Sequence, residues 1–91
     1  YMEERDYKFT PARKEEIQRT LMVDKALPDI SEPIERVSYM DGCKIYFKNG
    51  GWIIARFSGT EPLLRIFCEM PEAYQAVRMC ELFEEFLELK G

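Results

Sequence analysis

Apolar and polar residues alternate along the middle of the chain, which is the pattern of a half-buried β-strand. The clearest run is 43–48, where Cys43, Ile45 and Phe47 share one face and lysine and tyrosine residues share the other. Similar runs predict three further strands, at residues 34–40, 52–57 and 63–69. Turn sequences separate these strands, so we expect four consecutive strands linked as hairpins.

The connections between the strands differ in kind. Asp41-Gly42 suits a two-residue type I′ turn, in which both central residues need positive φ. Asn49-Gly50-Gly51 predicts a second tight turn. The third connection, residues 58–62, joins the last two strands and is richer in polar side chains than a turn requires.

A helix is predicted near the start of the chain. Thr10 is placed as its N-cap and Pro11 as its first helical residue, where the missing N–H of proline does no harm. Ile17 and Leu21 lie one turn apart on the buried side, and we expect the helix to end by Ala26. The Leu-Pro-Asp sequence that follows is typical of a helix end.

A second amphipathic helix is predicted after Pro71. Its apolar stripe consists of Ala73, Ala76, Val77, Cys80, Phe83 and Leu87. Its opposite, solvated face is predicted to carry Glu72, Glu81, Glu84, Glu85 and Glu88.

Together with a short extended stretch at 5–9, these segments give the element order β-α-β-β-β-β-α. The order predicts an α+β fold, with a four-stranded antiparallel sheet and both helices on one face. A chain of 91 residues builds one hydrophobic core, so we expect a single domain over 1–91. Because the first residue is Tyr1, we interpret the chain as a fragment of a longer protein.

Charge and cysteine usage narrow the class of protein. The net charge of −4 and the pI of about 4.9 argue against a nucleic-acid partner held by general electrostatics. Cys43, Cys68 and Cys80 have no metal-ligand spacing and no histidine accompanies them, so we interpret them as reduced thiols that pack as small hydrophobes. With no signal peptide or membrane-spanning run in sight, we expect a cytoplasmic domain without a metal, cofactor or membrane partner of its own.

The connection between the last two strands is the segment that carries candidate chemistry. Arg56 at the end of one strand can donate two parallel N–H bonds to a phosphate, in a geometry that lysine cannot reproduce. Ser58 and Thr60 add short hydroxyl donors. Gly59 between them lets the backbone approach a ligand or adopt a positive φ that turns N–H groups inward. This pattern favours an anion site.

Three neighbours complete this segment. Pro62 stiffens the exit of the loop, and Arg65 returns a second guanidinium on the next strand. Glu61 would repel a phosphate, so we expect it to point away from the ligand, towards a backbone amide or a basic side chain. Three or four charge-assisted bonds, less the entropy of association, predict phosphate binding in roughly the millimolar range. From these residues alone, a loop whose polar side chains merely satisfy turn geometry explains the pattern equally well.

Residues 55–69, Ala-Arg-Phe-Ser-Gly-Thr-Glu-Pro-Leu-Leu-Arg-Ile-Phe-Cys-Glu, resemble the C-terminal signature of the α-D-phosphohexomutase superfamily, which includes phosphoglucomutases and phosphomannomutases. Every fixed position of the pattern R-x-S-G-T-E-P-x-x-R is met. The resemblance extends over nearly the whole chain, because the predicted element order matches that of the family's fourth domain. It implies a TATA-box-binding-protein-like fold and identifies 1–91 as a C-terminal phosphate-binding domain.

The resemblance also implies a function for the parent protein. Such a parent is an isomerase of carbohydrate metabolism, an intramolecular phosphotransferase that moves phosphate between a phosphoserine and a hexose phosphate or bisphosphate, with Mg²⁺ held by another domain. The present domain would hold the phosphate that is not being transferred, through Arg56, Ser58, Gly59 and Thr60. Arg65 is an additional candidate that could equally pair with Glu61 or Glu69. The domain would contain no catalytic residue, would be inactive alone and would contact the other domains of its parent chain.

Two other classes of function are weighed against this one. The first is a non-catalytic α+β regulatory or interaction module with a structural hairpin loop. The second is an RNA-binding platform made of Trp52, Phe57 and Phe67, but the glycine and aromatic spacing of the RNA motif is not met and the charge balance is wrong. For these three aromatic residues we expect core packing.

Overall fold

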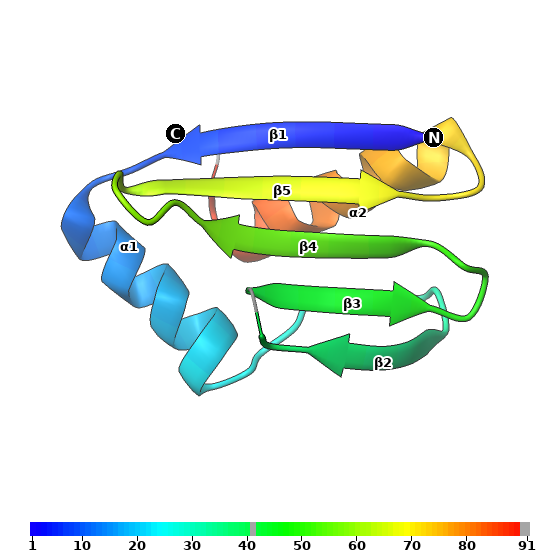
Figure 1. Cartoon of the computed structure of the whole chain (residues 1–91), viewed down its shortest axis with the longest axis horizontal. Helices are drawn as coiled ribbons and strands as arrows, with labels where there is room; N and C mark the ends of the chain where they lie inside the picture. The colour runs from blue at the N-terminus through cyan, green and yellow to red at the C-terminus, as the bar shows by residue number, and fades with distance from the viewer. Residues whose placement is uncertain (41, 90–91) are drawn as a thin grey trace.

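The computed structural model describes residues 1–40 and 42–89. Figure 1 shows the elements in the predicted order, and the α+β class is confirmed. A π-helical turn, η1, directly continues the first helix. The elements are β1 (Met2–Lys8), α1 (Pro11–Gln18), η1 (Arg19–Val23), β2 (Ile34–Ser38), β3 (Cys43–Phe47), β4 (Trp52–Phe57), β5 (Leu63–Glu69) and α2 (Ala73–Phe86).

The sheet has five strands in the described part of the chain, in the order β1-β5-β4-β3-β2, and every neighbouring pair is antiparallel. The predicted count of four was wrong, because β1 pairs with β5 over its whole length, from Met2 opposite Glu69 to Lys8 opposite Leu63. Charged residues dominate β1 and hide its alternation. Its main-chain bonds to β5 hold it at the edge of the sheet, beside the strand that follows the candidate loop.

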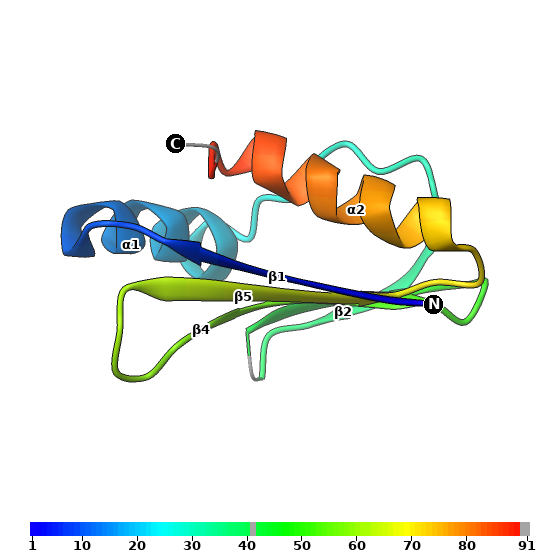
Figure 2. The same cartoon turned by 90° about the horizontal axis from the view of Figure 1, so that it is seen from above.

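Both helices cover the same face of the sheet, as predicted, and the opposite face is left open (Figure 2). The alternating side chains of β3, β4 and β5 point towards the helices and form the core with one side of α2. The three cysteines are buried there as free thiols, in line with their interpretation as small hydrophobes. The core comprises Ile17, Leu21, Cys43, Ile45, Phe47, Ile53, Ala55, Leu64, Ile66, Cys68, Met70, Ala76, Met79, Cys80, Phe83 and Leu87.

The first helix begins as predicted. The hydroxyl oxygen of Thr10 accepts a hydrogen bond from the backbone N–H of Arg13 at 3.2 Å, and Pro11 occupies the first turn. The regular α-helix ends at Gln18, earlier than expected, and η1 carries the buried Leu21. In η1 the backbone N–H of Asp24 reaches back five residues to the carbonyl of Arg19 at 2.8 Å, the spacing of a π-helical turn.

The second helix differs from prediction at Ala73, which was expected on the apolar stripe but is exposed, and at one glutamate. Glu84 was expected on the solvated face of α2, but its side chain is 8% exposed. It faces β1, where Tyr7 donates its hydroxyl proton to Oε2 of Glu84 at 2.5 Å and Arg5 lies 3.5 Å from the same oxygen. Since a buried carboxylate requires partners, the charged strand β1 explains how this glutamate is tolerated.

The turns agree with the sequence where they are described. Gly50 has a φ of +92°, and the backbone N–H of Gly51 donates to Oδ1 of Asn49 at 2.8 Å, so the second turn is tight as predicted. The predicted type I′ turn at Asp41-Gly42 includes Asp41, which lies outside the described residues. None of the helices formed by residues 1–40 and 42–89 is both long enough and apolar enough to cross a membrane.

Candidate functional site

The loop between β4 and β5 bends away from the helices, towards the open face of the sheet (Figure 2). Its two ends are closed by the backbone N–H of Ser58, which donates to the carbonyl of Leu63 at 2.9 Å. Its exit is fixed by a bond of 3.1 Å from the N–H of Phe9 to the carbonyl of Pro62. Inside the loop, the hydroxyl oxygen of Ser58 accepts long bonds from the backbone N–H groups of Thr60 and Glu61, at 3.4 and 3.3 Å. Ser58 therefore shapes the loop, and its own hydroxyl proton is left to donate.

Two arginines stand directly opposite each other on β4 and β5. The register places Arg56 against Arg65, and both alternate with buried neighbours, so both side chains lie on the open face. Like charges that face each other across an antiparallel pair destabilise a sheet by several tenths of a kcal/mol. The side chain of Arg56 forms no hydrogen bond or ion pair with any residue of 1–40 or 42–89. The pair thus concentrates positive charge in a domain that is negative overall.

A surface pocket of about 330 Å³ lies beside this pair. Four of the five predicted phosphate contacts line it, namely Arg56, Ser58, Gly59 and Arg65, and Thr60 is exposed on the loop outside the lining. Gly59 does not take the positive φ considered for it, and a Cβ at this position would have no neighbour within 4 Å. Its backbone is open to approach by a ligand.

Comparison with known proteins gives the family. Residues 11–86 match the family described as phosphoglucomutase/phosphomannomutase, C-terminal domain. The chain belongs to this family. The match covers both helices and strands β2 to β5, so it includes the loop and both arginines of the pocket, whereas β1 lies before it.

Two curated relatives come from Thermococcus kodakarensis. One is named phosphoglucomutase/phosphomannomutase and is 37% identical to the chain over 87 residues; the aligned region covers 93% of this chain and 19% of the relative. The other is named phosphopentomutase and is 36% identical over 81 residues; that aligned region covers 87% of this chain and 15% of the relative. The chain therefore spans less than a fifth of the length of these relatives.

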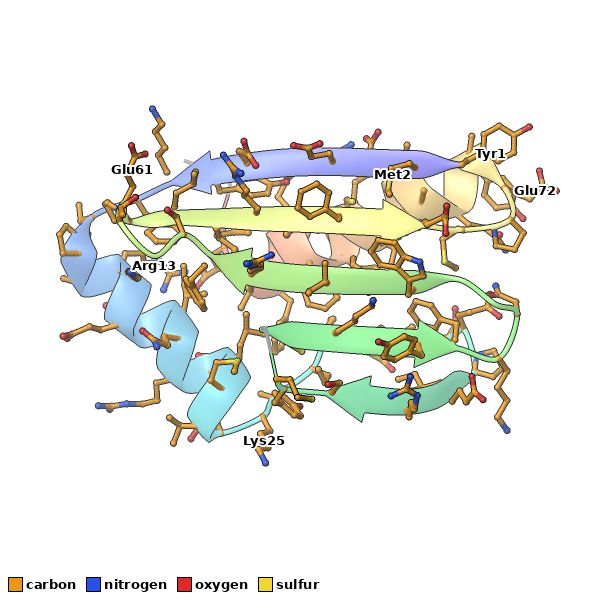
Figure 3. The ribbon with its side chains drawn as sticks, viewed as in Figure 1. Tyr1, Met2, Arg13, Lys25, Glu61 and Glu72 are labelled. Atoms are coloured by element: carbon orange, nitrogen blue, oxygen red, sulfur yellow. The ribbon has the colours of Figure 1, made fainter. Side chains whose placement is uncertain are left out.

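In this phosphoglucomutase/phosphomannomutase C-terminal domain, Arg65 pairs with neither of the residues that were considered from the sequence. Its Nε lies 3.6 Å from Oδ1 of Asp6 on β1, and it pairs with neither Glu61 nor Glu69. Glu69 instead accepts a hydrogen bond of 3.1 Å from the indole N–H of Trp52. Figure 3 shows Glu61 at the end of the loop with its side chain directed outward, and it does not line the pocket. Asp6 escaped prediction because its proximity to Arg65 depends on β1 joining the sheet beside β5.

The aromatic residues of the last strands divide between the two faces. Phe57 packs against the core and makes an edge-to-face contact with Phe9, with ring centroids 6.5 Å apart. Trp52 and Phe67 are half-buried and lie outside the core, contrary to expectation, because they alternate with its buried residues. The ammonium of Lys44 lies 4.6 Å from the Trp52 ring, so a cation of the domain already covers this ring.

A second polar cluster lies on the inner side of β1, away from the pocket. Arg5 contacts Glu3 at 3.1 Å and Glu84 at 3.5 Å, and Tyr7 bonds to Glu84. Burial and the hydrogen bond to Glu84 raise the pKa of Tyr7 to about 12. No sequence pattern indicated this cluster, because its members are far apart along the chain and lie in segments that were expected to be solvated.

Proposed function

We propose that this domain binds the phosphate group of a sugar phosphate within a larger phosphomutase. The observation that carries the proposal is the arginine pair: Arg56 and Arg65 are opposed on adjacent strands, both line one pocket, and Arg56 has no partner among the described residues. A phosphate carries between one and two negative charges and offers several acceptor oxygens, so it neutralises the repulsion that the pair creates. Family membership adds support, because the matched segment contains both arginines.

The proposal gives each contact a role. Arg56 donates from its free guanidinium, and Arg65 supplies the second positive charge. The hydroxyl of Ser58 donates its proton while its oxygen keeps the loop closed, and Gly59 leaves room for a phosphate oxygen near the backbone. Thr60 joins the site only through a shift of the loop or from the rim, since it lies outside the lining.

Chemistry on the substrate is proposed to take place elsewhere in the parent chain. The pocket offers positive charge and hydrogen-bond donors, which hold a phosphate but do not transfer it. The parent is proposed to be a cytoplasmic isomerase of the intramolecular phosphotransferase type. The Mg²⁺ that such a parent would use is proposed to be held by another of its domains. The isolated domain is proposed to be inactive.

The proposed substrate class is a sugar phosphate or bisphosphate. A hexose follows from the relative named phosphoglucomutase/phosphomannomutase, but the relative named phosphopentomutase is almost as similar, at 36% against 37% identity. The proposed site recognises the phosphate, which both kinds of substrate share. The choice of sugar is accordingly assigned to other domains of the parent.

A phosphate titration tests this function. Sodium phosphate is added to the ¹⁵N-labelled chain at constant ionic strength, and backbone amide shifts are followed. We expect selective shifts at Ser58, Gly59 and Thr60 that saturate in the millimolar range and are strongly reduced in Arg56→Ala at the same phosphate concentrations. The matched control is Arg36→Ala, which removes an exposed arginine that stacks on Tyr46 at 3.8 Å, outside the pocket.

Two results would contradict the proposal. One is the absence of selective shifts at tens of millimolar phosphate. The other is an equal loss of binding in Arg36→Ala and Arg56→Ala, which would indicate general attraction to the charge of the domain. Either result would favour the rival interpretation, in which the loop is a structural hairpin of a non-catalytic module.

A further inference from the structure

Strand β1 brings a third charged residue to the arginine pair. Asp6 is opposite Arg65, and Arg65 is opposite Arg56, so the three residues form one row across β1, β5 and β4. The family match begins at residue 11, so Asp6 lies outside the segment by which the family is recognised. We infer that Asp6 is a positioning residue that holds Arg65 towards the phosphate pocket, an inference that rests on the proposed function.

The atoms in contact suit a positioning role. Asp6 approaches the Nε of Arg65, at 3.6 Å, and the side chain of Arg65 makes no other ion pair or hydrogen bond within the described residues. The two terminal nitrogens of Arg65 therefore remain available to a ligand. A guanidinium held through its Nε presents these nitrogens as a fork, which matches two oxygens of a phosphate.

Without Asp6, the charge of Arg56 opposes this arrangement. The two guanidinium groups repel each other, and a long side chain at the surface relieves such repulsion by turning away. Placing Arg65 again when the ligand arrives costs side-chain entropy. Asp6 reduces this cost because it holds Arg65 in place before the ligand binds.

The ion pair between Asp6 and Arg65 is expected to contribute little to folding. The side chains of Arg65 and Asp6 are 53% and 44% exposed, and an ion pair this exposed contributes little to stability. The negative charge of Asp6 also opposes binding, because a carboxylate repels a nearby phosphate. General electrostatics thus predicts tighter phosphate binding when Asp6 is removed, whereas positioning predicts weaker binding. The sign of the change separates the two effects.

The experiment is a double-mutant cycle on the 91-residue chain, with inorganic phosphate as the probe at constant ionic strength. The variants are Asp6→Ala, Arg65→Ala and the double variant. Glu4→Ala is the matched control, because Glu4 is an exposed carboxylate on the same strand and face that stands opposite Phe67 instead of Arg65. Affinities come from the amide shifts of Ser58 and Gly59.

We expect Asp6→Ala to weaken phosphate binding about threefold in the presence of Arg65 and not to weaken it in the Arg65→Ala background. Glu4→Ala should leave binding unchanged or tighten it slightly. In spectra without phosphate, the Nε–H signal of Arg65 should lose its protection from exchange in Asp6→Ala and keep it in Glu4→Ala.

Three outcomes would overturn the inference while leaving the proposed function intact. These are unchanged or tighter binding in Asp6→Ala, an equal weakening in Glu4→Ala, and a weakening that persists in the Arg65→Ala background. If the unmodified chain binds no phosphate at the pocket, the proposed function fails and the inference fails with it. The two failures are thus distinguishable.

Discussion

Two arginines on the same sheet, Arg5 and Arg56, show how differently one side chain can be used. Arg5 on β1 faces the helices, where it contacts Glu3 at 3.1 Å and Glu84 at 3.5 Å. Arg56 on β4 faces the open side, and its side chain has no ion pair or hydrogen bond among the described residues, although a second arginine, Arg65, stands opposite it. The first guanidinium satisfies a buried carboxylate, and the second adds repulsion to an exposed surface.

The difference points to separate roles for the two regions. A charged side chain whose partners are buried contributes to the fold, because without it those partners would be buried without an opposite charge. A charge placed against a like charge costs stability, and the fold gains nothing from it. An anionic ligand offers a physical reason for the second arrangement. The predictions below test this division between an inner cluster that stabilises and an outer pair that binds.

The largest effect is expected on the inner side. Glu84→Ala should lower the free energy of unfolding by about 2 kcal/mol, because it removes the acceptor of Tyr7 and leaves Arg5 without its inner partner. Urea denaturation at pH 7 measures the change. Glu85→Ala is the control, since Glu85 is exposed and pairs with Arg78 at 3.9 Å on the surface. This variant should lower the free energy of unfolding by at most about 0.5 kcal/mol. Equal losses in the two variants would contradict a stabilising role for the inner cluster.

The next effect concerns the outer pair. Arg56→Ala should reduce phosphate affinity about tenfold, in line with the loss of one charge-assisted contact, and should not lower the free energy of unfolding. Arg5→Ala should do the reverse, with a loss of stability of about 1 kcal/mol and unchanged phosphate binding. Phosphate titration and urea denaturation give the affinity and the free energy of unfolding of each variant. If the two variants behave alike in both assays, the division between the regions is wrong.

A smaller effect is expected from Tyr7, with a distinct pH dependence. The pKa of Tyr7 is raised from 10.0 to about 12 by burial and by its bond to Glu84, so the folded state keeps the phenolic proton longer than the unfolded state. The stabilisation is therefore complete below pH 10 and is lost as the pH rises towards 12. Tyr7→Phe should cost about 1 kcal/mol at pH 7 and should flatten the fall in stability between pH 10 and 12. An equally steep fall in this variant would assign the pH dependence to other groups.

A small effect on stability is expected at the loop. Gly59 has no positive φ and an added Cβ would meet no atom within 4 Å, so Gly59→Ala should change the free energy of unfolding by no more than about 0.5 kcal/mol. The affinity of the Gly59→Ala variant for phosphate should nevertheless fall, because the new methyl group lies beside the pocket. Thermal denaturation and the titration check the two halves. A clear loss of stability would mean that the glycine serves the turn instead of the ligand.

The element order and the helix-covered face could be predicted because local signals carry them. Alternation marks the strand 43–48, and Thr10 and Pro11 mark the start of α1. The extended stretch at 5–9 was predicted, but its full length and its place in the sheet were missed, because charged side chains conceal its periodicity and its hydrogen-bond partner β5 is more than fifty residues away. Sheet order is a property of pairing, which a single segment does not encode.

In the candidate site, too, the residue types could be predicted from the sequence, but the contacts between strands could not. Its residue types follow from the motif, so Arg56, Ser58 and Gly59 could be named from the sequence. That Arg65 faces Arg56 depends on the register of β4 and β5, and that Asp6 faces Arg65 depends on β1 reaching the edge of the sheet. The same dependence on three-dimensional contacts explains why Glu84, exposed on a helical projection, proved to be buried.

The most direct test of the central claim is a crystal structure of the chain with a hexose bisphosphate. We predict one phosphate group between Arg56 and Arg65, with at least one oxygen within about 3 Å of a nitrogen of each guanidinium and near the hydroxyl of Ser58. A structure in which the two guanidinium groups diverge, or in which the ligand binds elsewhere while this pocket stays empty, would contradict the account.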